Sequence, residues 1–245
     1  PMKKRILSIL LLCCMVLTLL PTTVSAADGP MNTIPKYDVS IDVYNRTSDI
    51  SIKDSRSYYF YSSVPDKLRD TWAWDKKIFI KGDKAAPHVF IDGVNIEMSP
   101  SSKGPAIELN KKASAYLYFI GRDSTLQGAD GRAAIQKNRS EGQLYVLART
   151  GTTVTCKGGY RAAGIGGSWA IRNIGDSMFN MDMYGHGVNM HFGSQTNPDY
   201  WGGTINASGG EYGAGIGAGS WGSTGYGNGI HGGAGEQLYF YSGTV

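Results

Sequence analysis

The chain has 245 residues, a formal net charge of +4 and 18% charged residues, and 41% of its residues are hydrophobic. Three of the positive charges, Lys3, Lys4 and Arg5, lie at the start of the chain, so the remainder is close to neutral. This balance does not give the strongly basic surface of a nucleic-acid-binding protein. We therefore expect no nucleic-acid partner.

Residues 1–26 have the pattern of a secretory signal peptide. The three basic residues precede an apolar run at 6–20, and the small residues Val24-Ser25-Ala26 suit cleavage after Ala26. The run of about 15 residues is shorter than the roughly 20 that a spanning helix needs. We expect the mature protein to be secreted or held at the cell surface, with no membrane contact after cleavage. Cys156 is then its only cysteine, which we expect to be buried as a small apolar side chain.

Residues 27–80 are less regular than the rest of the mature chain. Apolar and polar residues alternate at 39–43 and 50–52, an aromatic run follows at 58–61, and residues 78–82 lead into a clearer pattern. We interpret 27–80 as an N-terminal cap with the first irregular coils of a repeat array. The repeat region proper is assigned to 81–245, because the end of such an array needs a cap.

Apolar pairs recur through the middle of the chain at a nearly constant step. Val89/Ile91, Leu117/Phe119 and Leu144/Val146 follow one another at steps of 28 and 27 residues. Alternation with period two places each pair on the inner face of a strand. The isoleucines Ile107, Ile135, Ile165 and Ile216 are 28, 30 and 51 residues apart, which predicts that they stack in adjacent coils. Later strands are predicted at Phe179/Met181/Met183 and at Leu238/Phe240.

Glycine is concentrated in the second half of the chain, where 26 of the 34 glycines lie from residue 151 onward. Two stretches there, 153–169 and 204–221, share Thr-x-x-x-x-Gly-Gly, then Ala-Gly-Ile-Gly, then Ser-Trp, and the second has one extra glycine. A third copy begins at Thr244-Val245. We therefore expect these repeats to belong to a longer repeat protein, with the array cut at residue 245.

The repeats predict an all-β fold of stacked units. The first choice is a right-handed parallel β-helix, or β-solenoid, with coils of about 28 residues. The alternative is a β-sandwich, although strands of a sandwich need not recur at matched positions.

Several of these repeats resemble a known family. The segments VFIDGVNI at 89–96, GPAI at 104–107, Thr-Leu-x-Gly at 125–128 and AGIG at 163–166 and 214–217 resemble secreted glycine-rich repeats of Gram-positive anaerobes described as carbohydrate-binding domains. They are also similar to calcium-dependent, polygalacturonate-binding β-helix modules. The resemblance implies an extracellular β-helix that binds glycans or forms a surface stalk. Its matched residues are turn glycines and core aliphatics, so it transfers no ligand-binding residue.

Aromatic residues among the glycines are the main candidates for a binding site. Trp169 and Trp221 occupy equivalent places in the repeat, and Tyr160, Tyr212 and Trp201 lie nearby. Aromatic faces can stack on the C–H surfaces of sugars, and flanking glycines allow a ligand to approach. The same residues could instead close a packed aromatic corner.

Charged residues give weaker candidates. Arg132 and Arg161 are interpreted as aligned in neighbouring coils, where they could bind carboxylates or form a solvated rim. Asp92-Gly93 and Asp130-Gly131 could offer oxygen ligands to calcium, but Asp-Gly is also ordinary turn chemistry. Calcium is the one cofactor that the residues leave open.

Catalytic patterns are weak in this chain. The histidines at 88, 186, 191 and 231 lack zinc-site spacing and are interpreted as surface or loop residues, and no compact acid–base set stands out. We therefore predict a non-catalytic surface module that binds a polysaccharide, such as a host or cell-wall glycan, or acts as an adhesive stalk. A polysaccharide lyase or glycoside hydrolase on the same fold, and a purely structural spacer, are the alternatives.

Overall fold

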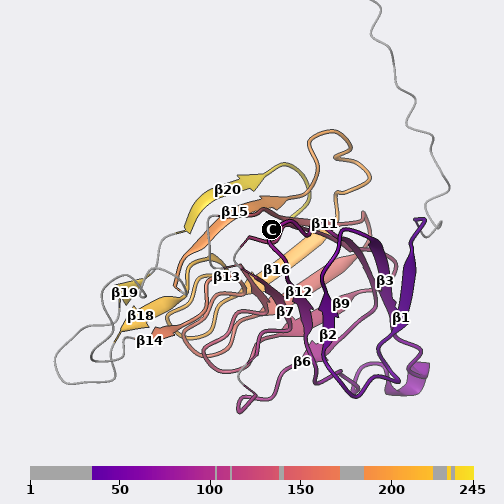
Figure 1. The fold of residues 1–245 in the computed structure, drawn as a ribbon, viewed down its shortest axis with the longest axis horizontal. Helices are drawn as coiled ribbons and strands as arrows, with labels where there is room; N and C mark the ends of the chain where they lie inside the picture. The colour runs from indigo at the N-terminus through magenta and orange to yellow at the C-terminus, as the bar shows by residue number, and fades with distance from the viewer. Residues whose placement is uncertain are drawn as a thin grey trace, which may run out of the picture. The chain divides into compact units, whose positions relative to one another are not determined.

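The structure, a computed structural model, describes residues 35–102, 104–110, 112–137, 141–171, 185–222, 231–232 and 235–245. Within these residues the protein is built from short β-strands and one 3-10 turn, η1 (Asp66–Leu68). The strands form three parallel sheets and one small additional sheet (Figure 1). The prediction of an all-β fold is confirmed.

Sheet A has seven strands, whose spatial order follows the chain. They are β1 (Val39–Asp42), β3 (Ser57–Tyr61), β5 (His88–Asp92), β8 (Ala115–Phe119), β11 (Leu144–Ala148), β15 (Gly187–Phe192) and β20 (Gly235–Phe240).

Sheet B has six strands and sheet C has four. From the N-terminal end, sheet B contains β2 (Ile50–Ile52), β4 (Ile78–Ile80), β7 (Ile107–Leu109), β10 (Ile135–Gln136), β13 (Ile165–Gly166) and β17 (Ile216–Gly217). Sheet C contains β6 (Ile96–Glu97), β9 (Ser124–Gln127), β12 (Thr153–Lys157) and β16 (Thr204–Ser208). The small sheet D contains β14 (Ala170–Ile171), β18 (Ser220–Gly222) and β19 (His231–Gly232).

The chain visits the three large sheets in turn. Strands β8, β9 and β10 belong to sheets A, C and B, after which β11 returns to pair in parallel with β8. All described pairings in sheets A, B and C are parallel, and only β18 and β19 pair in the antiparallel sense. This arrangement is compatible with a β-solenoid. It differs from the antiparallel sheets of the alternative β-sandwich.

Sheet B contains a ladder made only of isoleucines. Ile107 pairs with Ile135, Ile135 with Ile165, and Ile165 with Ile216. The side chains of Ile107, Ile135 and Ile165 have no exposed surface. The predicted stack is confirmed, and it extends toward the N-terminus through Ile78 and Ile50.

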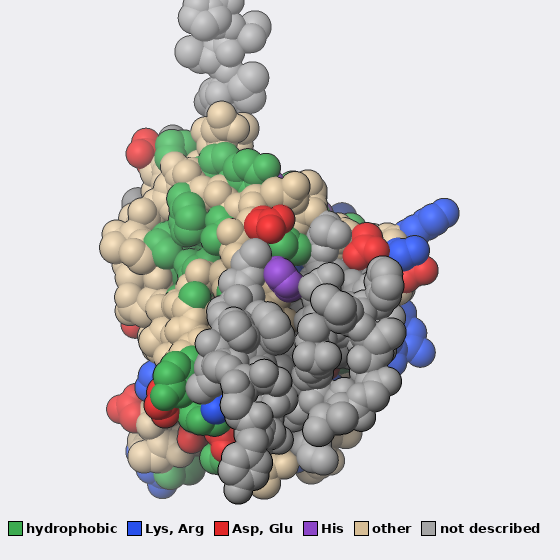
Figure 2. Space-filling view, turned by 90° about the vertical axis from the view of Figure 1, so that its left-hand side faces the viewer, with side chains coloured by type: hydrophobic (Ala, Val, Ile, Leu, Met, Phe, Trp, Pro, Cys, Tyr) green, Lys and Arg blue, Asp and Glu red, His purple; other side chains and the backbone are tan. Residues whose placement is uncertain are grey.

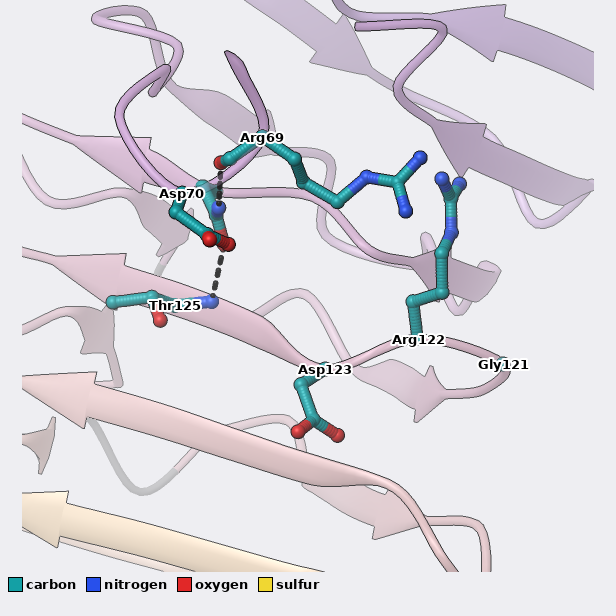
Figure 3. Close-up of a pocket in the computed structure, with 7 residues that line it drawn as sticks. Arg69, Asp70, Gly121, Arg122, Asp123 and Thr125 are labelled. Atoms are coloured by element: carbon teal, nitrogen blue, oxygen red, sulfur yellow. Dashed lines mark hydrogen bonds between the residues drawn. The ribbon is translucent and has the colours of Figure 1, made fainter. Parts of the chain in front are cut away.

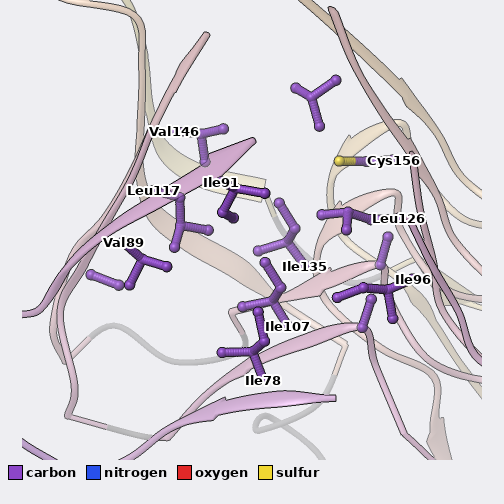
Figure 4. Packing of buried hydrophobic residues seen from close by; sticks show 14 of the residues in the cluster. Ile78, Val89, Ile91, Ile96, Ile107, Leu117, Leu126, Ile135, Val146 and Cys156 are labelled. Carbon is purple, nitrogen blue, oxygen red and sulfur yellow. The ribbon is translucent and has the colours of Figure 1, made fainter. Parts of the chain in front are cut away.

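The core lies where the inner faces of the three sheets meet (Figure 4). Sheet A contributes the column Val89, Leu117 and Val146, all of which the sequence predicts to face inward. The predicted step of 27 residues to the third pair is wrong, because Val146 and not Leu144 pairs with Leu117. Sheet C contributes Ile96, Leu126 and Cys156. Cys156 is fully buried, as predicted, and burial raises the pKa of its thiol. The core is therefore one continuous apolar column that runs through successive coils.

The later strands differ in part from the prediction. The strand expected at Phe179/Met181/Met183 falls outside the described residues, and the strand that follows β11 in sheet A is β15, which the spacing did not predict. The strand expected at Leu238/Phe240 is present as β20. Thr244 pairs with Thr204, so the third copy of the repeat begins in register with the second.

Residues 35–80 contribute β1 to β4 to the same sheets that continue downstream. The assignment of 27–80 as a cap with irregular first coils stays a prediction. Among the described residues, no helix has the length and apolar character needed to cross a membrane.

Candidate functional site at a glycine-rich corner

Three tight turns between sheets C and B stack on one another and form a corner. The turns 129–132, 159–162 and 210–213 are each closed by a hydrogen bond from the fourth N–H to the first carbonyl oxygen, for instance Ala162 N to Gly159 O at 3.0 Å. The third residue of each turn has a positive φ: 72° at Gly131, 62° at Arg161 and 66° at Tyr212. We call these three turns the glycine-rich corner.

Backbones of successive coils come very close at this corner. An added Cβ would lie 1.9 Å from Ala129 O at Gly159, 2.1 Å from Gly159 O at Gly210, and 2.0 Å from Ala162 O at Gly213. No side chain fits at these three positions without moving the neighbouring coil. Coil-to-coil contact thus explains the second glycine of each pair, whereas a Cβ added at the first, Gly158 or Gly209, would lie 2.3 or 2.2 Å from a carbonyl oxygen of its own coil.

Two side chains occupy backbone positions that normally favour glycine. Arg161 and Tyr212 both have the left-handed conformation, which costs non-glycine residues on the order of 1 kcal/mol each. Such strain is found where the surrounding structure holds a side chain in place, often at a functional site. Here it directs two large side chains outward from a corner made mostly of glycine and alanine.

The turn register corrects the predicted alignment of the arginines. Arg132 is the fourth residue of its turn and corresponds to Ala162 and Gly213, whereas Arg161 is the third residue and corresponds to Gly131 and Tyr212. The two arginines therefore do not form a ladder. The two turns have equal length, because Thr125 pairs with Thr155 and Ile135 with Ile165. The alignment failed because Arg161 stands one position earlier in its turn than Arg132 does.

Four of the predicted residues come together around one guanidinium group. The guanidinium carbon of Arg161 lies 5.0 Å from the ring centre of Tyr160, 5.0 Å from that of Trp169 and 5.9 Å from that of Tyr212. Tyr160 is 39% exposed and Tyr212 is 56% exposed. The cluster combines cation–π contacts with ring surface that faces solvent.

Trp169 is held against the preceding coil. Its backbone N–H donates to Gly131 O at 2.9 Å, and a Cβ added at Gly131 would lie 3.2 Å from the indole Cε3. Glycine at the third position of the first turn therefore makes room for the indole ring. The packed position of Trp169 supports the corner-packing alternative for this residue.

Two donors of the cluster lack a partner. Trp169 Nε1 and Arg161 Nε are buried and have no hydrogen-bond partner among the described residues. Buried N–H groups are normally paired with protein or water.

Two exposed acidic residues also belong to the corner: Asp130 is the second residue of the first turn and Glu211 the second residue of the third. Tyr160 has the same position in the middle turn. A hydrogen bond to Glu211 raises the pKa of the Tyr212 hydroxyl above its ordinary value.

The register also corrects the match between the two tryptophans. Trp221 pairs with Ala170, and Ser220 N donates to Arg161 O just as Trp169 N donates to Gly131 O. Ser220 therefore takes the place of Trp169 in the next coil. The extra Gly219 moves Trp221 one position along the strand, so the expected pair of matched tryptophans is absent from the corner.

Trp201 lies apart from the corner, in the connection between β15 and β16. Its ring centre is 5.1 Å from that of Tyr118 and 4.8 Å from that of Tyr200. It packs with Tyr118 against a small apolar cluster that contains Tyr59, Phe90 and Ile120. Trp201 thus covers the outer side of sheet A and does not join the predicted platform.

The outer face of sheet A carries a stack of rings that the sequence analysis missed. Neighbouring ring centres are 4.4–4.6 Å apart along His88, Tyr116, Tyr145, His191 and Tyr239. Because these rings cover one another's faces, only their edges remain for a ligand, so the stack is not a platform for sugar rings. The sequence did contain a signal for this stack. Tyr116 and Tyr145 are each next to an inward apolar residue of a predicted strand, so alternation places both on the outer face.

The expectation of surface or loop histidines is wrong for His191, whereas His88 is a partly exposed strand residue. Both belong to strands of sheet A, and His191 is only 8% exposed. Burial lowers the pKa of both imidazoles. Their Nδ1 atoms lie 3.0 Å from the hydroxyls of Tyr118 and Tyr241 respectively. Burial also raises the pKa of Tyr118 to about 12.

The two aspartates proposed for calcium have different surroundings. Asp92 accepts hydrogen bonds from Tyr59 Oη at 2.8 Å and Arg122 Nε at 3.0 Å. Burial raises the pKa of Asp92, but these hydrogen bonds outweigh it and the pKa lies below its ordinary value. A guanidinium at this distance opposes a bound cation. Asp130 is exposed at the corner, and no group of three metal-ligating side chains occurs within the described ranges.

On the face shown in Figure 2, acidic and basic side chains of the described residues are mixed and do not form separate patches. Exposed hydrophobic groups lie beside them.

A scan against protein-family models, a search of curated proteins and a search of solved structures each found no match.

Proposed function

We propose that the protein is a non-catalytic extracellular module that binds a polysaccharide at the glycine-rich corner. The proposed fold is a right-handed parallel β-helix with coils of about 28 residues in its regular part. The spacing of the isoleucines and the cyclic order of sheets A, C and B support this architecture. A rigid array of coils can present the same corner repeatedly to a repeating polymer.

The cluster around Arg161 is the observation that carries the proposal. Tyr160 and Tyr212 offer exposed ring surface, and Arg161 offers planar N–H donors beside it. Sugars present C–H faces to aromatic rings and hydroxyl oxygens to such donors, so the two kinds of group suit one ligand. The left-handed backbone at Arg161 and Tyr212 supports a functional reason, because glycine would be less strained at both positions.

A purely structural corner is the second candidate. It is favoured by the packing of Trp169 on Gly131 and by the contact of one guanidinium with three rings, which already uses part of each ring face. A structural spacer needs the cluster for stability alone. A binding module needs it for affinity, and its stability should depend little on the exposed rings.

A glycan array probed with the purified protein tests the proposal. We expect binding of an extended polysaccharide with a Kd on the order of 10 µM to 1 mM, because a single chain offers few contacts and multivalent arrays gain from avidity. Tyr212→Ala and Tyr160→Ala should each weaken binding about tenfold, the loss of roughly 1.4 kcal/mol that one ring contact supplies.

Tyr44→Ala is the matched control, since Tyr44 is 36% exposed and lies in the connection that follows β1. It should bind as the wild type does. Equal binding by all three variants, or no binding by the wild type, would remove the support for a site at this corner.

Export is a separate part of the proposal. The basic start, the short apolar run and the small residues before Ala27 support cleavage after Ala26. Secretion from a Gram-positive host followed by N-terminal sequencing should give a chain that begins at Ala27. Retention of residues 1–26 in the exported protein would contradict this part alone.

A further inference from the structure

A polar cavity of about 520 Å³ lies at a different corner of the array, between sheets A and C. Arg69 and Asp70 reach it from the segment after η1, Asn95 from the connection of β5 to β6, and residues 121–125 from the end of β8 to the start of β9. Nothing in the proposed glycan site uses these residues. The cavity is lined by charged and amide groups and contains no aromatic side chain.

Two arginines extend toward the same part of this cavity, as Figure 3 shows. Two hydrogen bonds to Asp92 hold the side chain of Arg122 in place. Its Nε donates to Asp92 Oδ1 at 3.0 Å, and its terminal nitrogen Nη2 donates to Asp92 O at 3.3 Å. Its side chain lies on Gly93, where an added Cβ would be 2.8 Å from Arg122 Nε. The arginine is therefore held in position before any ligand arrives.

Arg69 is the second basic group. It forms an ion pair with Asp66, a residue whose side chain is 89% exposed. Its Nε is buried and has no hydrogen-bond partner within the described ranges. Both guanidinium groups therefore present N–H donors to one cavity, where the oxygens of one anion can accept from both.

The cavity lining also contains hydrogen-bond acceptors, and hydrogen bonds to neighbouring segments hold some of them in place. Asn95 accepts a hydrogen bond from Thr125 N at 2.9 Å and donates to Arg69 O at 3.4 Å, which ties the two walls together. Asp123 accepts from Thr153 N at 2.7 Å and, like Asp70, is exposed. Carboxylates in such places can accept hydrogen bonds from ligand hydroxyls.

We propose that this cavity binds a small hydroxyl-bearing ligand that carries an oxyanion, with the oxyanion held by Arg69 and Arg122 and hydroxyls held by Asp70 and Asp123. The planar N–H fork of arginine matches carboxylate, sulfate and phosphate oxygens, which share this geometry. One sugar bearing such a group has the required combination. The site is independent of the glycine-rich corner.

Calorimetric titration of the whole protein tests this site with four probes: glucose, glucuronate, glucose 6-sulfate and glucose 6-phosphate. We expect at least one charged sugar to bind tenfold or more tightly than glucose, and its affinity to fall as salt is raised. The sugar that binds best distinguishes carboxylate, sulfate and phosphate as the preferred group. Inorganic phosphate, sulfate and acetate, titrated alone, should each bind less tightly than the matching sugar.

Arg69→Gln should weaken the charged sugar at least tenfold, and it should fold normally because its partner Asp66 is solvated. Arg122→Lys keeps a charge near Asp92 but removes the planar fork, and it should also weaken binding. Arg56→Gln is the control, since Arg56 is ion-paired with Asp54 on the surface away from the cavity lining. Tyr212→Ala should leave this binding unchanged, which separates the cavity from the corner.

Equal affinity for glucose and all three charged sugars would overturn the proposal. So would an equal loss of binding in Arg56→Gln and Arg69→Gln, or no binding of any charged sugar. Inorganic anions that bind as tightly as the sugars would overturn the part of the proposal that concerns hydroxyls.

Discussion

Glycine residues in the early coils and in the late coils leave room for different neighbours. At Gly93 and Gly121, in the early coils, an added Cβ would meet the side chains of Arg122 and Asp92, at 2.8 and 2.6 Å. At Gly159 and Gly213, in the late coils, it would meet a backbone oxygen of the neighbouring coil, at 1.9 and 2.0 Å. Gly93 and Gly121 thus make room for an ion pair, and Gly159 and Gly213 allow two backbones to touch. The late corner consequently has few large side chains.

The core, which both regions share, should respond most strongly to substitution. Ile165→Asp places a carboxylate in the isoleucine ladder between Ile135 and Ile216. Burial of an unpaired charge costs at least several kcal/mol, so we expect the protein to unfold or to melt far below the wild type. Thr155→Asp, on the outward side of β12, is the control and should melt close to the wild type in a thermal scan. A normal melting curve for Ile165→Asp would show that the ladder is not the core.

The close approach of the late coils predicts the next largest effect. Gly159→Ala forces the coil away from Ala129 O, and we expect a loss of about 3 kcal/mol, the upper part of the usual range for overpacking. Gly104→Ala is the control, because the nearest atom to its Cβ is the end of a flexible side chain, Met98 Cε, at 3.1 Å. Chemical denaturation measures both. If the two variants lose the same free energy of unfolding, the late glycines have no special role in coil contact.

These two regions also differ in how far the sequence could predict them. The ladder of Ile107, Ile135 and Ile165 follows from spacing alone, because inward residues of stacked coils must recur at one period. The cluster of Tyr160, Arg161, Trp169 and Tyr212 was found only as a list of candidates.

The pairing within that list depended on turn register. One inserted glycine moved Trp221 away from the place of Trp169, whereas Arg132 and Arg161 differ by one position within turns of equal length. The cavity at Arg69 and Arg122 could not be predicted, because it joins segments that no repeat relates. Patterns thus predict the core of a repeat array more reliably than its irregular corners.

Backbone strain at the late corner predicts a substitution that stabilises the protein, unlike the two substitutions above. Tyr212→Gly removes a residue that is 56% exposed from a left-handed position, so we expect the free energy of unfolding to rise by up to about 1 kcal/mol. The same variant should lose polysaccharide binding. Denaturation and array binding, measured together, separate the roles: a less stable variant would mean that Tyr212 is a packing residue.

The histidines of the outer stack predict a small pH effect. Burial lowers the pKa of His88 and His191 below the ordinary 6.5, so the unfolded chain takes up protons at a higher pH than the folded chain. The stabilisation is present above pH 6.5 and is lost as the pH falls from 6.5 toward the lower folded pKa. We expect a lower melting temperature at pH 5.5 than at pH 7.5.

His191→Phe keeps a ring in the stack and should reduce this pH difference. His186→Gln, which changes a histidine outside the stack, is the control. A melting temperature that is the same at both pH values in the wild type would contradict the buried environment of the stacked imidazoles.

The most direct test of the central claim is the NMR signal of the Trp169 indole N–H during titration with the polysaccharide that binds best on the array. The signal is assigned by its disappearance in Trp169→Phe. The proposed function predicts a saturable shift of this signal, with the same Kd as the binding isotherm and with no comparable shift for Trp74, which lies in the core. Unchanged Trp169 and shifted signals elsewhere would show that the polysaccharide does not bind at the glycine-rich corner.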